Sequence, residues 1–200
     1  MRYFAHMLIS MSLLLLWAPK GMSLELVPKI GLALGSLTKR GDTAEKDRKF
    51  AFGGVPVSVA TYQALSMDWS GSAQFQLMMD FINRQIIRQG IDLGLNWHLS
   101  GGPSSYELIK DHVSIENAYD ISWVFRLGYT NFSAVNRGTD VIKVAGSLVE
   151  VRTGFSFRRS LSPHAGWGLE VLTSVFNLPA SIEQLDTKFT EASLFYTRPF

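Results

Sequence analysis

The chain has 200 residues, of which 46% are hydrophobic and 18% charged, and its formal net charge is +2. This composition suits one domain with a sizeable core and excludes a disordered chain or a miniature disulfide scaffold. The chain contains no cysteine, which excludes a disulfide framework, thiol catalysis and cysteine-ligated metal sites.

The first residues are typical of a secretory signal peptide. A basic Arg2 precedes an apolar run over residues 7–17, and small residues follow up to Ser23. A membrane-spanning helix would need about 20 apolar residues, and this run is shorter. We therefore expect residues 1–23 to form a cleaved signal peptide and residues 24–200 to form the mature domain.

Cleavage would also change the charge of the chain. It would remove Arg2 and Lys20, which leaves 17 basic side chains against 17 acidic ones. A neutral chain without a long basic run gives no electrostatic argument for a nucleic-acid partner.

Beyond residue 23 no apolar run approaches helical membrane length, and segments of strict alternation recur instead. Apolar and small or polar residues alternate over residues 29–37, 57–69 and 91–99. Alternation of this kind predicts β-strands with two different faces.

The segment over residues 72–90 is ambiguous. Phe75, Met79, Ile82 and Ile86 fit one face of a helix, whereas Phe75, Leu77 and Met79 fit a strand. We favour the strand, because the short "RQG" leads directly into the next strand and suits a hairpin, whereas a lone helix would lack a packing partner.

The second half of the chain continues the pattern. Alternation recurs over residues 113–129, 149–157, 167–175 and 189–200, which brings the number of strands to eight. We expect the connections between strands around residues 39–54, 70–71, 88–90, 101–111, 131–140, 160–164 and 177–188. We predict an all-β fold, a closed antiparallel up-and-down transmembrane β-barrel. The connection over residues 101–111 is long, and an extra hairpin there would give ten strands as the alternative.

The two faces of these strands differ in a way that indicates lipid outside. One face carries bulky aliphatic and aromatic residues, among them Trp69, Trp97, Trp123 and Trp167, which suit a membrane interface; aromatic core packing is the alternative. The other face is rich in small and amide residues and carries isolated charges. We predict that these charges pair inside the barrel and brace it, at Asp80, Asp92, Arg126, Glu150, Arg152 and Glu170.

The last ten residues, "EASLFYTRPF", carry a family resemblance. Leu194, Tyr196 and the terminal Phe200 alternate in a way that resembles the C-terminal assembly signal of bacterial outer-membrane barrels, although Arg198 and Pro199 depart from the usual pattern. The whole mature chain resembles the small eight-stranded members of that group, of the OmpA, OmpX and OmpW types.

The resemblance implies a location and a topology. It implies a monomer in the outer membrane, with outer-membrane lipid and the barrel-insertion machinery as partners and both chain ends in the periplasm. The connections over residues 39–54, 88–90, 131–140 and 177–188 would then face outside the cell.

Motifs that would indicate an enzyme are absent from the sequence. There is no phosphate loop, Rossmann glycine pattern, metal-spaced histidine set or nucleophile elbow, so we expect no catalytic, cofactor-binding or metal-binding residues. His98 falls on the inner face near Asp92, where we expect a hydrogen-bonded interior residue. Ser162 and His164 could belong to a lipid-modifying hydrolase, but turn residues are the better reading.

These observations favour a nonenzymatic outer-membrane barrel with a structural or surface-interaction role in the cell envelope. The alternative is a narrow, OmpW-like conduit for small or hydrophobic molecules. A lipid-modifying enzyme and a soluble exported barrel that carries a lipid are less favoured.

Overall fold

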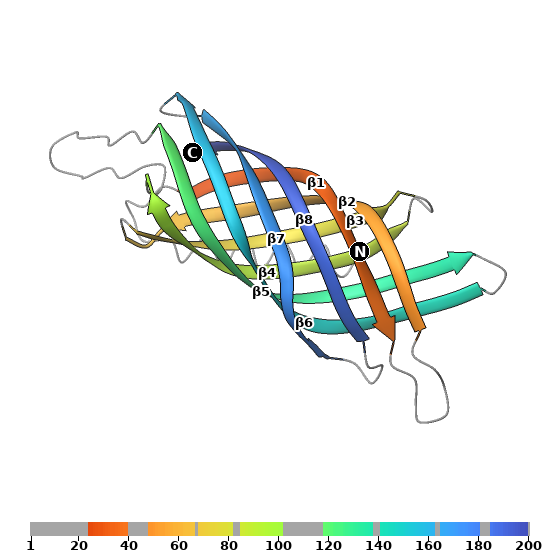
Figure 1. The fold of residues 1–200 in the computed structure, drawn as a ribbon. Helices are drawn as coiled ribbons and strands as arrows, with labels where there is room; N and C mark the ends of the chain where they lie inside the picture. Colours follow the sequence, from red (N-terminus) through yellow and green to blue (C-terminus); the bar gives the residue numbers. More distant parts are fainter. Residues whose placement is uncertain are drawn as a thin grey trace, which may run out of the picture.

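The fold is a closed antiparallel barrel (Figure 1). The computed structural model describes residues 24–39, 48–66, 68–81, 85–101, 118–137, 141–162, 165–180 and 185–199. No helix long and apolar enough to cross a membrane occurs in these ranges. The eight strands are β1 (Leu24–Lys39), β2 (Arg48–Ala64), β3 (Trp69–Asp80), β4 (Ile86–Ser100), β5 (Tyr119–Arg137), β6 (Val141–Ser162), β7 (Ala165–Pro179) and β8 (Leu185–Pro199).

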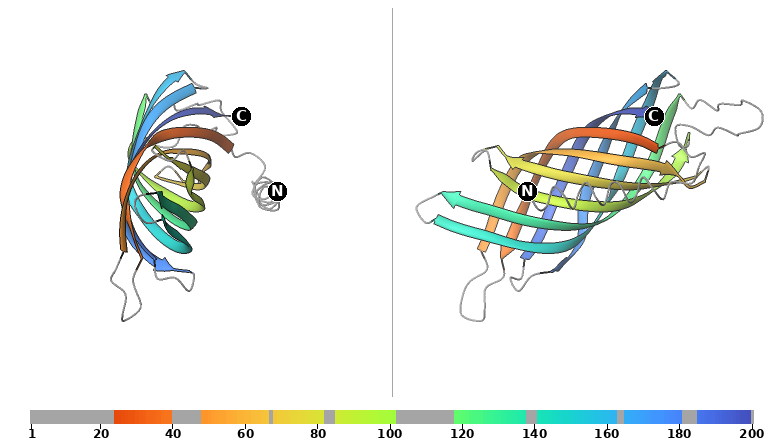
Figure 2. Two further views of the ribbon diagram at one scale, coloured as in Figure 1. Left: turned by 90° about the vertical axis from the view of Figure 1, so that its right-hand side faces the viewer. Right: turned by 180° about the vertical axis from the view of Figure 1, so that it is seen from behind.

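Each strand pairs with its neighbours along the chain, and β1 closes the barrel against β8. The strands are strongly tilted and enclose one interior, as Figure 2 shows from two further sides. Strand β4 pairs directly with β5 from Arg88↔Phe132 to Ser100↔Ile121. No extra hairpin is therefore inserted between them, and the prediction of eight strands is confirmed whereas ten is wrong.

Alternation along the strands separates an apolar outside from a polar inside. On β4 the outward residues are exposed and the inward ones buried, and this holds around the barrel; the outward set includes Ile30, Leu32, Leu93, Leu95, Leu127, Phe155, Leu169 and Leu194. An outward face of this kind is what a membrane-spanning barrel presents to lipid. The ambiguous segment after residue 72 forms β3, so the strand prediction is confirmed there.

One predicted strand contains a turn. Alternation over residues 57–69 predicted a single strand, but β2 ends at Ala64 and β3 begins at Trp69. The backbone N–H groups of Leu65 and Ser66 both donate to the carbonyl of Trp69, at 2.9 and 3.0 Å. The even spacing of apolar residues continues through this tight hairpin. A period-two pattern therefore could not reveal the turn.

Several predicted connections are also wrong, because they lie within strands. Residues 88–90 belong to β4, and the chain reverses earlier, where Asp80 N–H donates to the carbonyl of Gln85 at 2.9 Å. Polar residues were interpreted as solvent-facing turns, but the interior of this barrel is polar as well. For the same reason residues 131–137 belong to β5, and β6 begins at Val141. The predicted start of β5 at residue 113 falls outside the described residues, and β5 is observed from Tyr119.

Candidate functional site: the charged interior

The barrel interior holds a layer of fully buried charges supplied by six of the eight strands. Period-two alternation points Asp92 and Arg88 of β4 inward, and it does the same for Arg126 of β5. Register then places Arg126 directly opposite Arg152 of β6. Like charges opposite one another destabilise a sheet, so both arginines require acidic partners from strands across the interior.

The first cluster surrounds Glu170 of β7. Lys29 Nζ donates to Glu170 Oε1 at 2.7 Å, and Arg126 Nη2 donates to Glu170 Oε2 at 2.8 Å. The hydroxyl of Tyr62 accepts hydrogen bonds from both cations, at 2.7 and 2.8 Å. One carboxylate therefore joins β1, β5 and β7, and Tyr62 adds β2 to the same cluster.

The second cluster surrounds two arginines. Arg152 pairs with Asp92 and, at 3.1 Å, with Glu191 of β8. Arg88 pairs with Glu150 and also donates to Gln76. The amide of Gln76 in turn donates to Glu191 at 2.6 Å, which connects the two halves of this cluster.

The charges in the two clusters balance. Four cations, Lys29, Arg88, Arg126 and Arg152, meet four anions, Asp92, Glu150, Glu170 and Glu191, and none of these residues is more than 3% exposed. Isolated burial would cost several kcal/mol for each ion, so the pairing is what makes this interior tolerable. Small residues make the room: a side chain at Gly94 would overlap Arg126, and one at Gly128 would overlap Asp92.

No protein-family model matches the chain, and no curated relative matches it either. Solved structures do resemble it. The N-terminal β-barrel domain of Pseudomonas aeruginosa OprF matches with a TM-score of 0.52 and 10% identity, over 88% of this chain and 97% of that one. Neisserial surface protein A matches with a TM-score of 0.51 and 9% identity, again over 88% and 97%. The chain has the fold of a small outer-membrane barrel.

All six charges that the sequence places inside this outer-membrane-type barrel are buried. The structure brings five of the six together in the two clusters: Asp92, Arg126, Glu150, Arg152 and Glu170. Asp80 is buried at the end of β3, opposite Gly54.

Sequence reasoning missed three charges of the clusters. Arg88 was placed in a turn, although it lies four residues from Asp92 on the same face of β4. Lys29 and Glu191 have outward apolar neighbours at Ile30 and Ala192, and this alternation was the signal that could have placed them inside.

His98 lies on the inner face but has different partners from those expected. Its Nδ1 lies 2.7 Å from Asp120 Oδ1, and its Nε2 lies 3.0 Å from Ser70 Oγ. Asp92 is six residues away along the same strand, which corresponds to about 20 Å, so the predicted proximity was wrong.

The opposite end of the interior holds an aromatic cluster. Phe52, Phe132 and Phe189 pack with ring centroids 6.3 and 6.4 Å apart, and the guanidinium of Arg88 lies 4.7 Å from the centroid of Phe189. The barrel interior thus has a polar end at His98, a charged middle and an aromatic end.

Residues expected to form the assembly signal lie on β8 or beyond it. Leu194 and Tyr196 point outward and are exposed, while Phe200 lies outside the described residues. Residues 1–23 and His164 also lie outside them, and of Ser162 only the backbone is described. Within the described ranges, no group of three or more acidic or histidine residues could hold a metal ion.

Proposed function

We propose that this protein is a nonenzymatic barrel of the bacterial outer membrane, with a structural or surface-interaction role in the envelope. The single observation that carries the proposal is the balanced charge layer, which fills the middle of the interior with paired side chains. An interior of eight strands is only just wide enough for side chains. The barrel therefore acts through its outer wall and its ends and not through a pore.

The likeness to outer-membrane barrels and the apolar outward face support this location. Export through the predicted signal peptide, insertion by the barrel-insertion machinery and a monomeric state complete the proposal. The exposed outward residues would contact outer-membrane lipid.

Conductance in planar bilayers tests this function. We expect the purified protein to show little or no steady ion current, because Arg126 and Arg152 with their partners block the interior. Brief, small currents would be compatible with movement of individual side chains. Stable, large, ohmic channels that Arg126→Ala or Arg152→Ala abolishes would contradict the proposal and favour the narrow conduit.

A further inference from the structure

The barrel wall is incomplete between β7 and β8. These strands are registered over only eight residue pairs, from Gly166↔Thr197 to Thr173↔Thr190. The next shortest registers, between β2 and β3 and between β3 and β4, each contain eleven. Beyond Thr173 and Thr190 both strands continue without pairing to each other, and we call the opening between residues 174–179 and 185–189 the β7/β8 cleft.

A β-bulge explains why the two strands separate. Arg152 of β6 pairs with Ser174, but the next residue, Val151, pairs with Phe176, so Val175 is an extra residue on β7. A bulge bends its strand. After it, β7 continues to follow β6, and Ala180 N–H still donates to the carbonyl of Ser147 at 2.8 Å.

Strand β8 meanwhile follows β1. It remains registered with β1 from Gly35↔Phe189 to Lys39↔Leu185. Each edge of the cleft is thus held by its other neighbour, and the opening is a property of the fold and not of a frayed strand end.

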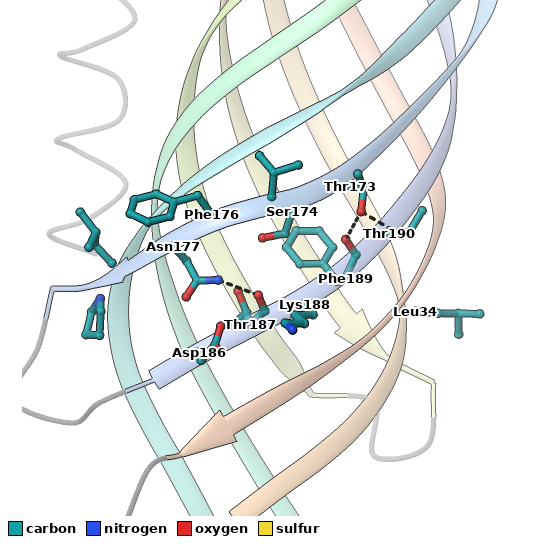
Figure 3. Close-up of a pocket in the computed structure, with 13 residues that line it drawn as sticks. Leu34, Thr173, Ser174, Phe176, Asn177, Asp186, Thr187, Lys188, Phe189 and Thr190 are labelled. Carbon is teal, nitrogen blue, oxygen red and sulfur yellow. Dashed lines mark hydrogen bonds between the residues drawn. The ribbon is translucent and has the colours of Figure 1, made fainter.

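Side chains cross the cleft where backbone pairing would be expected. Asn177 Nδ2 donates to the carbonyl of Thr187 at 2.6 Å, and Thr173 Oγ1 donates to the carbonyl of Phe189 at 3.4 Å (Figure 3). Within a strand the N–H and C=O of one residue point to the same side, so the N–H groups of Thr187 and Phe189 also face β7. Among the described residues, no residue of β7 is in register with Thr187 or Phe189.

The cleft holds a cavity of about 830 Å³ with two contrasting sides. This volume lies within the range of about 300–1,000 Å³ that is typical of small-molecule sites. The outer lip is apolar and exposed and consists of Leu34, Val175, Phe176 and Leu178. It continues the lipid-facing surface of β1 and β7.

The inner side of the cleft contains hydrogen-bonding groups that lack partners. The hydroxyls of Ser174 and Thr187 are buried and make no hydrogen bond in the structure, and Thr187 is only 1% exposed. A buried hydroxyl without a partner is unfavourable, so both point to a ligand that completes them. Asp186 and Lys188 also line the cavity, and their opposite charges leave no net charge there.

We propose that the β7/β8 cleft binds a single-chain amphiphile with a small uncharged head, such as a fatty alcohol or a fatty amide. The head enters between the strands, where free hydroxyls and strand-edge N–H groups offer both donors and acceptors. The alkyl chain lies outside along Phe176 and Leu178. The head must be small, because the side chain of Asn177 already spans the opening, and a lip of four exposed apolar residues suits a single chain.

An extended peptide is the competing occupant, since unpaired strand edges accept added strands. It would have to displace the Asn177 bridge along its whole path. The apolar outer lip also faces the membrane and not the water from which a peptide would arrive, so the amphiphile is favoured.

Photolabelling in lipid nanodiscs tests the site with a fatty alcohol that carries a diazirine on its chain. We expect saturable labelling within residues 171–180 and 185–190, competed by unlabelled dodecanol. Thr187→Val should weaken binding about three- to tenfold, the effect of one hydrogen bond. Thr187→Val should not destabilise the barrel, because the lost hydroxyl has no partner.

Thr197→Val is the matched control, since Thr197 is an inward residue on the same strand, 4% exposed, at the other end of the barrel. It should bind like the unaltered protein. Ser174→Trp should fill the cleft and remove the labelling, with folding checked by heat-dependent gel migration. If Thr187→Val fails to fold, Ser174→Ala removes the other unpaired hydroxyl of the cleft, and its effect on labelling is compared with the control in the same way.

Three results would overturn the proposal. Labelling spread evenly over all outward strands would show a nonspecific lipid contact only. Equal labelling by a two-chain phospholipid probe would contradict the single-chain ligand. Protection of the cleft by an added extended peptide, without competition by dodecanol, would assign the site to a peptide.

Discussion

At the residue scale, position on a strand decides what a substitution does, because neighbouring residues face opposite environments. On β4, Leu95 points outward and is 47% exposed, whereas the adjacent Asn96 points inward and donates to Ser70 Oγ at 3.0 Å. The same chemical change therefore has different consequences one residue apart.

The first prediction compares these two positions. Leu95→Arg should lower the free energy of unfolding by about 2–4 kcal/mol, because it places a charge in the lipid region. Asn96→Ala should cost about 1 kcal/mol, since it removes one interior hydrogen bond. Urea titration of the barrel refolded in lipid vesicles measures both, and the reverse order would mean that inside and outside are exchanged.

A second prediction concerns Glu170, which pairs with both Lys29 and Arg126. Glu170→Gln should destabilise the barrel by about 3–5 kcal/mol, because it leaves two buried cations without their anion. Adding Lys29→Met removes one of these cations and should recover part of the loss. Unfolding titrations of the single and double variants test this, and a double variant less stable than the single would refute the pairing argument.

At the element scale, β8 contributes to more features of the barrel than any other strand discussed above. It closes the barrel against β1, supplies Glu191 to the interior and forms one edge of the β7/β8 cleft. Its outward Leu194 and Tyr196 belong to the motif that resembles an assembly signal. Damage to this strand should therefore affect assembly before it affects any later step.

We predict that Tyr196→Asp, or deletion of Phe200, reduces insertion and leaves degraded periplasmic protein. The reason is that the last strand must both be recognised by the insertion machinery and pair with β1. Membrane fractionation and immunoblotting measure the yield, and Thr190→Ser on the same strand serves as the conservative control. Normal insertion of both altered proteins would show that this motif is not required for assembly.

At the scale of the whole molecule, stability comes from closure and from contacts that cross the interior. Every strand has two neighbours, and the ion pairs join strands that are not adjacent, such as β1 with β7 and β4 with β6. A closed barrel also leaves few backbone groups unpaired in lipid. Partial unfolding must therefore break several strands' contacts together.

Heat-dependent gel migration tests this cooperativity. The detergent-extracted protein should migrate as a compact species without heating and as an extended chain after boiling, in a single step. The Glu170→Gln barrel should make this transition at a lower temperature. A water-soluble protein without any heat-dependent shift would contradict the membrane placement.

Period-two alternation is a local property, and it was sufficient to predict an all-β barrel of eight strands, its inner and outer faces and five of the eight charges in the two clusters. It could not locate the turn between Ala64 and Trp69, because the even spacing of apolar residues continues through it. It could not place Arg88 inside either, because polar residues suit both a turn and a polar interior. Only the tertiary structure decided which charges meet, since partners such as Lys29 and Glu170 are 141 residues apart. The β7/β8 cleft likewise depends on the bulge at Val175 and on how the closed sheet holds its edges. Such contacts follow from register and barrel closure, which bring together strands that are far apart in the sequence. Local alternation along one strand does not specify which of these strands will meet.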